Sequence, residues 1–167
     1  MQKYIGTKTL RARPMTRGEY NNYRGWTIPA NEDQNEGGYL VEYEDGGKPN
    51  DGRHQGCISW IPANVFEKAY RPVTGLTFGQ ALEALKAGQR VARKGWNGKG
   101  MYLWLLPAAK VKVEWCREPH LKAVAEANGG EIEALGSIRM MTADKKVLTG
   151  WLASQTDMLC EDWEVLA

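Results

Sequence analysis

Residues 91–106 read VARKGWNGKGMYLWLL. The stretch begins like a strand, passes through a loop that contains three glycines and three cations, and ends in a strongly apolar run that Pro107 closes. Because short apolar runs bounded by turn residues favour strands, we expect strands at residues 90–93 and 102–106. The loop therefore joins two strands, and the C-terminal half of the chain is organised around it.

The loop at residues 93–101 carries more chemistry than a turn requires. Glycines let the backbone expose its N–H groups and approach a ligand closely. Cationic side chains bind phosphate, an indole stacks on a base or covers a sugar, and a carboxamide reads a polar edge. An ordinary glycine-rich hairpin with solvated cations and a core tryptophan is the alternative interpretation. The candidate ligand-binding residues here are Arg93, Trp96, Asn97, Gly98 and Lys99.

A second informative stretch, residues 151–163, reads WLASQTDMLCEDW. Ser154 is a good N-cap for a short helix, and Asp157 would lie near the positive end of that helix. In one interpretation this is simply a capped helix between two strands, with both flanking tryptophans in the core. In the other, the polar side chains contact ribose hydroxyls. The second interpretation adds Ser154, Gln155 and Asp157 to the candidate ligand-binding residues.

Catalytic readings of the sequence are weaker. Asp157 and Glu161 have helical spacing and, with Asp162, could form paired carboxylates for hydrolysis. No nucleophile with its base and no histidine lies nearby, so a solvated acidic face is the preferred interpretation. The loop glycines fit neither a Walker nor a Rossmann pattern, since no Gly-Lys-Ser/Thr follows them and no helix opens after them. We predict no catalytic residues.

Composition and charge narrow the function classes further. Lysine plus arginine number 22 and aspartate plus glutamate 20, and a net charge of +2 argues against a protein that coats DNA. Three widely spaced cysteines and two distant histidines predict reduced thiols, no metal centre and no cofactor. No apolar run approaches 18 residues and the N-terminus lacks a signal-peptide core, so we expect no membrane segment.

The first part of the chain, residues 1–73, is expected to form a small α+β domain, with a boundary at residues 72–75. Its expected elements are a strand at 4–13 with Ile5 on one face, a helix capped by Thr16 and ending at Gly25, strands at 39–43 and 57–60, and a helix at 62–70 that buries Val65, Phe66 and Ala69.

The second part, residues 76–167, is expected to be an α+β domain in which a small antiparallel sheet packs against one main helix. A capping box at Thr77 begins that helix, and Gly88 ends it. Further expected elements are a strand through Val111, Val113 and Trp115, a helix opened by Pro119, paired strands at 137–142 and 147–151, and a final strand at 163–166.

Four segments carry a resemblance to a known family: residues 77–88, 91–101, 151–159 and 161–163. Together they resemble the phage-encoded type-two Thoeris anti-defence family over about residues 76–167. Residues 1–73 resemble a leader domain of other phage proteins whose role is unknown, so that part of the resemblance implies no chemistry.

The resemblance implies a sponge that acts in the cytoplasm of an infected bacterium. In Thoeris defence a TIR protein makes a cyclic ADP-ribose isomer, glycocyclic ADP-ribose, and this messenger activates an effector. Family members are expected to sequester the messenger without cleaving it, as homotetramers with pockets between protomers. Some members also hold cyclic oligonucleotides. The alternatives are an accessory module that binds protein or nucleic acid and, less favoured, a messenger hydrolase; no DNA partner is expected.

Carried onto this sequence, the resemblance assigns Trp96 and Asn97 to the pocket and Arg93 or Lys99 to phosphate. Gln155 and Asp157 become candidate ribose contacts. The added first domain and a long connection at residues 115–136 depart from the family pattern.

Overall fold

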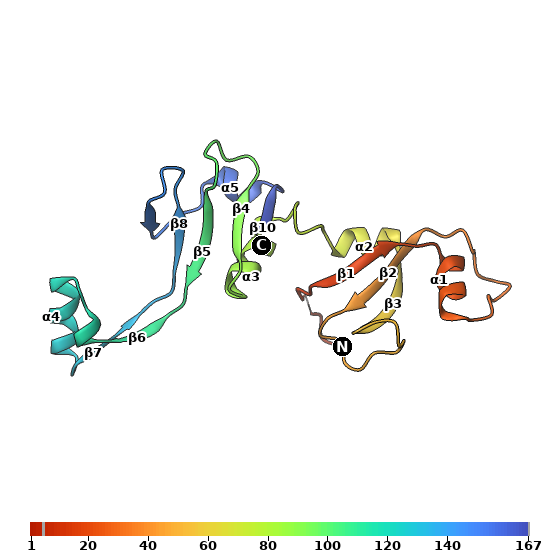
Figure 1. The fold of residues 1–167 in the computed structure, drawn as a ribbon, viewed down its shortest axis with the longest axis horizontal. Coiled ribbons are helices and arrows are strands. Elements are labelled where there is room, and N and C mark those ends of the chain that lie inside the picture. The colour runs from red at the N-terminus through yellow and green to blue at the C-terminus, as the bar shows by residue number, and fades with distance from the viewer. Residues whose placement is uncertain (5, 167) are drawn as a thin grey trace. The chain divides into compact units, whose positions relative to one another are not determined.

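The computed structural model describes residues 1–4 and 6–166 and divides into two compact units, Met1–Arg71 and Pro72–Ala167 (Figure 1). The first unit has an antiparallel three-stranded sheet in the order β1-β2-β3. The second has an antiparallel five-stranded sheet in the order β10-β4-β5-β8-β9. The fold class is therefore α+β, as predicted. None of the helices in the described residues is long and apolar enough to cross a bilayer.

In the first unit the local signals predict the elements well. The strands are β1 Leu10–Pro14, β2 Gly38–Tyr43 and β3 Cys57–Pro62, and the helices are α1 Arg17–Arg24 and α2 Ala63–Ala69. The capping box predicted at Thr16 is confirmed, because its hydroxyl accepts from the Glu19 N–H and the Glu19 carboxylate accepts from the Thr16 N–H. Gly25 ends α1 at φ 68°, a left-handed conformation that glycine adopts without cost.

Two expectations for this unit are wrong. The first strand begins at Leu10, because the described residues before it pair with no other strand, and Ile5 lies outside the described residues. Helix α2 does not bury Val65 or Ala69, which are both exposed. Phe66 alone of the predicted trio is half-buried, and it stacks between the rings of Tyr39 and Tyr70. Helix α2 is therefore attached to the sheet by aromatic stacking and not by a stripe of aliphatic side chains.

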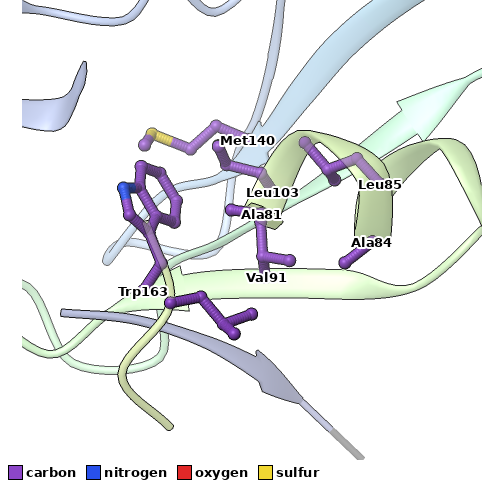
Figure 2. Close-up of a cluster of buried hydrophobic side chains, with 8 residues drawn as sticks. Ala81, Ala84, Leu85, Val91, Leu103, Met140 and Trp163 are labelled. Atoms are coloured by element: carbon purple, nitrogen blue, oxygen red, sulfur yellow. The ribbon is translucent and has the colours of Figure 1, made fainter. Parts of the chain in front are cut away.

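The second unit places its main helix on the predicted sheet. The sheet strands are β4 Arg90–Arg93, β5 Tyr102–Leu106, β8 Ser137–Met141, β9 Val147–Thr149 and β10 Trp163–Leu166, and the main helix is α3 Phe78–Lys86. The Thr77 capping box begins α3, which is confirmed by its reciprocal bonds with Gln80. Figure 2 shows Ala81, Ala84 and Leu85 of α3 gathered with Val91 and Leu103 of the sheet in one buried cluster, with Trp163 and Met140 beside them.

Residues 109–134 form an arm that continues from β5 and β8 (Figure 1). Strands β6 Ala109–Lys112 and β7 Glu131–Ala134 pair, and helix α4 Pro119–Ala127 lies between them in sequence. The predicted strand through Trp115 is wrong after Lys112, because Val113–Trp115 forms a short 3-10 helix that leaves the Trp115 ring exposed. The helix opened by Pro119 is confirmed, and β7 was not expected.

Candidate ligand-binding site

The glycine loop between β4 and β5 is joined to the short helix α5, Gln155–Leu159, by the guanidinium of Arg93. Arg93 Nη1 donates to Asp157 Oδ1 at 2.8 Å and Arg93 Nε donates to Asp162 Oδ1 at 2.9 Å. The Arg93 side chain is only 10% exposed. One arginine thus joins the start of the loop to α5 and to the residues that follow α5.

Asp157 is the centre of this network. Its Oδ1 also accepts from the Trp96 indole N–H at 3.2 Å. Its Oδ2 accepts from the Ser154 N–H at 2.9 Å and from the Ser154 hydroxyl at 2.7 Å. Four donors occupy the four lone-pair sites of an ionised carboxylate, so Asp157 has no acceptor capacity left for a ligand. The N-cap predicted at Ser154 is confirmed, and Asp157 completes it as a capping box.

Asp162 completes the framework from the other side of Arg93. Its Oδ2 accepts from the Gly95 N–H at 2.8 Å, and its backbone carbonyl accepts from the Lys94 N–H. A Cβ on Gly95 would lie 2.6 Å from Asp162 Oδ2, so a side chain at this position would disturb that contact. Asp162 therefore holds the first turn of the glycine loop.

The pKa values of both aspartates reflect these partners. Burial raises the pKa of Asp157, but hydrogen bonds from Ser154, Arg93 and Trp96 outweigh burial and lower it to about 2. The Arg93 guanidinium is the main reason that the pKa of Asp162 also falls to about 2, and the same bond raises the pKa of Arg93. All three groups are therefore charged at neutral pH.

Four aromatic side chains pack together beside the Arg93 network and form an aromatic wall: Phe78, Trp96, Trp151 and Trp163. The Trp163 ring is fully buried, and its indole N–H donates to the Asp157 carbonyl at 2.9 Å. Trp96 and Trp151 meet it edge-on with ring centroids at 5.4 Å and 6.2 Å, and Phe78 of α3 lies at 5.6 Å. Both tryptophans therefore belong to the core, as one interpretation of the sequence predicted. Trp163 is fully buried and Trp151 is half-buried.

The structure brings the predicted site residues together in two layers. Arg93, Trp96 and Asp157 belong to the bonded inner layer. Asn97 and Lys99 on the loop and Gln155 on α5 are exposed, and Ser154, the exposed N-cap of α5, is bonded to Asp157. Gly98 serves packing, because a Cβ there would lie 2.3 Å from Met101 Sδ and 2.7 Å from Ala143 Cβ.

Lys145 is a candidate that sequence reasoning missed. It lies in the turn between β8 and β9 at φ 63°, an uncommon conformation for a residue with a side chain. A Cβ on Gly100 would lie 2.7 Å from Lys145 Nζ, so this ammonium lies directly on the glycine loop. No sequence signal links residue 145 to residue 100, because only strand pairing brings the two turns together.

The carboxylate-pair alternative loses its geometric basis. Helix α5 ends at Leu159, so Glu161 does not share a helical face with Asp157, and that expectation is wrong. Asp157 and Asp162 face Arg93 instead of an open reaction site. In the described residues no cluster of three or more histidine, cysteine or acidic side chains could hold a metal ion.

The lowered pKa values predict acid sensitivity of this unit. Because the folded-state pKa values of about 2 lie below the ordinary 3.8, protonation favours the unfolded chain. The stabilisation is complete above about pH 4 and is lost as pH falls toward about 2. Hydrogen exchange of β4 amides at pH 5 and pH 2.5, corrected for intrinsic rates, measures this loss. Asp162→Asn should flatten the dependence, and an unchanged slope in that variant would contradict the assignment.

Comparison with known proteins covers this same unit. Residues 76–166 match the Tad2-like family, described as the Thoeris anti-defense 2-like domain. The protein Thoeris anti-defense 2 of Bacillus phage SP01 is 38% identical over 101 residues, which span 56% of this chain and 98% of that protein. The family match contains the glycine loop, the Arg93 network and α5, whereas residues 1–71 lie outside it.

Proposed function

This chain belongs to the Tad2-like, or Thoeris anti-defense 2-like, family, and from that premise we propose that it binds and sequesters, without cleaving, the cyclic ADP-ribose isomer messenger of Thoeris defence. Its role is anti-Thoeris. The messenger, glycocyclic ADP-ribose in this proposal, would be held in the cytoplasm of the infected host, out of reach of the effector.

The observation that carries the proposal is the rigid joining of the glycine loop to α5 through Arg93. It holds two segments that are distant in sequence against each other, and both segments carry exposed polar side chains. We assign the exposed edge of Trp96 and the Asn97 carboxamide to the base, Lys99 with Lys145 to the pyrophosphate, and Ser154 and Gln155 to the riboses. Arg93 and Asp157 act as positioning residues, because each already meets a fully charged partner.

The same contacts support sequestration rather than hydrolysis. A general base requires a pKa near the working pH, and the pKa values of Asp157 and Asp162 are about 2. Both carboxylates are also bonded to Arg93, which occupies acceptor sites that a general base would need. A sponge needs no nucleophile, and tight binding comes from pre-organisation of the polar groups that meet the ligand.

A homo-oligomer, in our proposal a tetramer, would complete the pocket. Leu152 and Leu159 are 87% and 78% exposed, and Met158 is 40% exposed, all beside the predicted ribose contacts. Clustered exposed apolar side chains mark interaction surfaces. A second protomer placed here would cover them and close the ligand site, and separate sites for cyclic oligonucleotides are a further part of this proposal.

The test mixes purified full-length protein with the messenger from an activated TIR protein, removes free ligand, denatures the protein by heat and identifies what is released. Intact messenger in proportion to protein is expected. A breakdown product would make the protein an enzyme, and nothing retained would leave a binding module for protein or nucleic acid as the leading function. A gel shift at physiological salt would test nucleic acid directly.

Variants locate the site within the same assay. Asn97→Ala and Lys99→Ala should each weaken messenger binding about tenfold or more, since a hydrogen bond to a charged group contributes about 1.5–3 kcal/mol. Lys86→Ala is the matched control, because among the described residues Lys86 pairs with Glu83 on the surface of α3. Normal binding by both loop variants would mean that the pocket lies elsewhere.

A further inference from the structure

The first unit contains a cleft that lies outside the residues matched by the Tad2-like family. It has a volume of about 590 Å³ and lies between β1, β2 and the loop before β3. Its lining is polar throughout, and comprises Arg11, Glu42, Glu44, Arg53, His54, Gln55 and Gly56. A smaller adjoining hollow adds Arg13 and Leu40. Ligand sites for small molecules commonly have volumes of about 300–1,000 Å³.

The back of the cleft is a fixed relay of three side chains. His54 Nδ1 lies 2.9 Å from Glu42 Oε2, and His54 Nε2 lies 2.8 Å from the Tyr23 hydroxyl. The other Glu42 oxygen accepts from the backbone N–H groups of Gln55 and Gly56. These bonds lower the pKa of Glu42 to about 2, and the bond from His54 has the largest effect. Glu42 is therefore ionised, and His54 Nδ1 donates to it. The loop is thereby held rigidly against β2.

Three guanidinium groups surround this relay, and they differ in what they contact. Arg53 is held by two bonds to Asp51, and its guanidinium lies 3.7 Å from the centre of the Tyr23 ring. Arg11 makes one exposed contact with Glu44, in which the two side chains are 78% and 49% exposed. Arg13 lies 5.1 Å from the Tyr23 ring and has no carboxylate partner in the part of the chain that the structure describes.

Arg11 and Arg13 point to the same side of β1. They are two residues apart, and their register partners Glu42 and Leu40 lie on the face of β2 that lines the cleft. Alternate residues of a strand are separated by about 7 Å, which lets two long side chains converge on one tetrahedral anion. An exposed pair such as Arg11 with Glu44 contributes little, so Arg11 exchanges its partner readily.

We propose that this cleft binds a small phosphorylated molecule, with the phosphate between Arg11 and Arg13 and the rest of the molecule against His54 and Gln55. Guanidinium groups match the planar, two-point recognition of phosphate oxygens. The volume accommodates a nucleoside monophosphate or a sugar phosphate. A long nucleic acid is disfavoured, because residues 1–73 carry 10 basic and 9 acidic side chains, which gives a net charge of only +1.

The test is NMR titration of the full-length protein at constant ionic strength with inorganic phosphate, adenosine monophosphate and glucose 6-phosphate. Saturable shifts are expected for the amides of residues 11–13 and 54–56. Arg13→Ala should weaken binding about tenfold. Lys68→Ala removes one charge from α2, which packs through Phe66 and Tyr39 on the opposite face of the sheet, and should leave the affinity unchanged.

The two organic phosphates separate the possible sources of the ligand. If adenosine monophosphate binds most tightly of the three probes, the ligand is a nucleotide. If glucose 6-phosphate binds most tightly, the ligand is a sugar phosphate. Shifts that do not saturate, or equal weakening in Arg13→Ala and Lys68→Ala, would overturn the proposal. Because the readout is confined to amides of the first unit, its outcome is independent of messenger binding by the second.

Discussion

Replacing Asp157 with alanine is expected to destabilise the C-terminal unit by about 3–5 kcal/mol, the range for breaking a buried ion pair by removing one partner. The change removes the acceptor for Arg93 Nη1, the Trp96 indole N–H and both Ser154 donors. It also leaves Arg93, with a side chain only 10% exposed, beside Asp162 alone. The helix cap and the anchor of the glycine loop are lost together.

Native-state hydrogen exchange on the full chain measures this effect unit by unit. Exchange of α3 and β4 amides should accelerate in Asp157→Ala, whereas amides of β2 in the first unit should be unchanged. Asp144→Ala is the matched control, because that aspartate is 60% exposed and pairs with Lys146 at the surface. It should cost about 1 kcal/mol or less. Equal effects of the two variants would show that the Arg93 network is not structural and that Arg93 is available to a ligand.

Local sequence signals predicted helix starts reliably because a capping box is complete within four residues. Thr16 with Glu19 and Thr77 with Gln80 make the expected reciprocal bonds, and Ser154, which was expected as an N-cap, makes such bonds with Asp157. The bonds satisfy N–H groups that no other part of the helix can reach. Such a signal needs no tertiary contact, so it survives in a sequence read alone.

Other features of the fold depend on partners that are distant in sequence. The alternation of Val111, Val113 and Trp115 suits a strand, but β7 pairs with β6 only as far as Lys112, so the chain turns at Val113. Helix α2 likewise has an apolar stripe, and the sheet offers it an aromatic ring at Tyr39 instead of an aliphatic face. Whether an apolar residue is buried thus depends on the element that packs against it, and not only on the spacing of apolar residues in the sequence.

The candidate site shows the same division. Sequence reasoning singled out two segments because their residue types are unusual for turns, and the structure joins these two segments through Arg93. The resemblance assigned Arg93 or Lys99 to phosphate, whereas the structure places two aspartates, 64 and 69 residues away, on the Arg93 guanidinium. An arginine cannot reveal from sequence whether its anion is a ligand or a side chain. The question is decided by the antiparallel pairing of β10 with β4, which sets Trp163 opposite Arg93 and so brings Asp162 beside it.

Trp163→Ala is expected to destabilise the same unit by about 3–5 kcal/mol through the loss of a fully buried aromatic side chain. Trp163 contacts the rings of Phe78, Trp96 and Trp151, and its indole N–H donates to the Asp157 carbonyl. The substitution would open a cavity beside α3. It would also remove the hydrogen bond from the indole N–H to the Asp157 carbonyl. Because the Trp96 ring packs edge-on against Trp163, messenger binding should weaken even under conditions in which the variant remains folded.

Trp163→Phe and Trp115→Ala separate packing from general effects of losing an indole. Trp163→Phe keeps most of the ring contacts and loses the hydrogen bond, so it should fall between the wild type and Trp163→Ala. Trp115 is 61% exposed on the arm, and its replacement should change the stability of the unit little. Urea unfolding followed through the α3 amides gives all three values. A Trp163→Ala loss no greater than that of Trp115→Ala would mean that the aromatic wall does not support the sheet, and the ligand site would then rest on the Arg93 network alone.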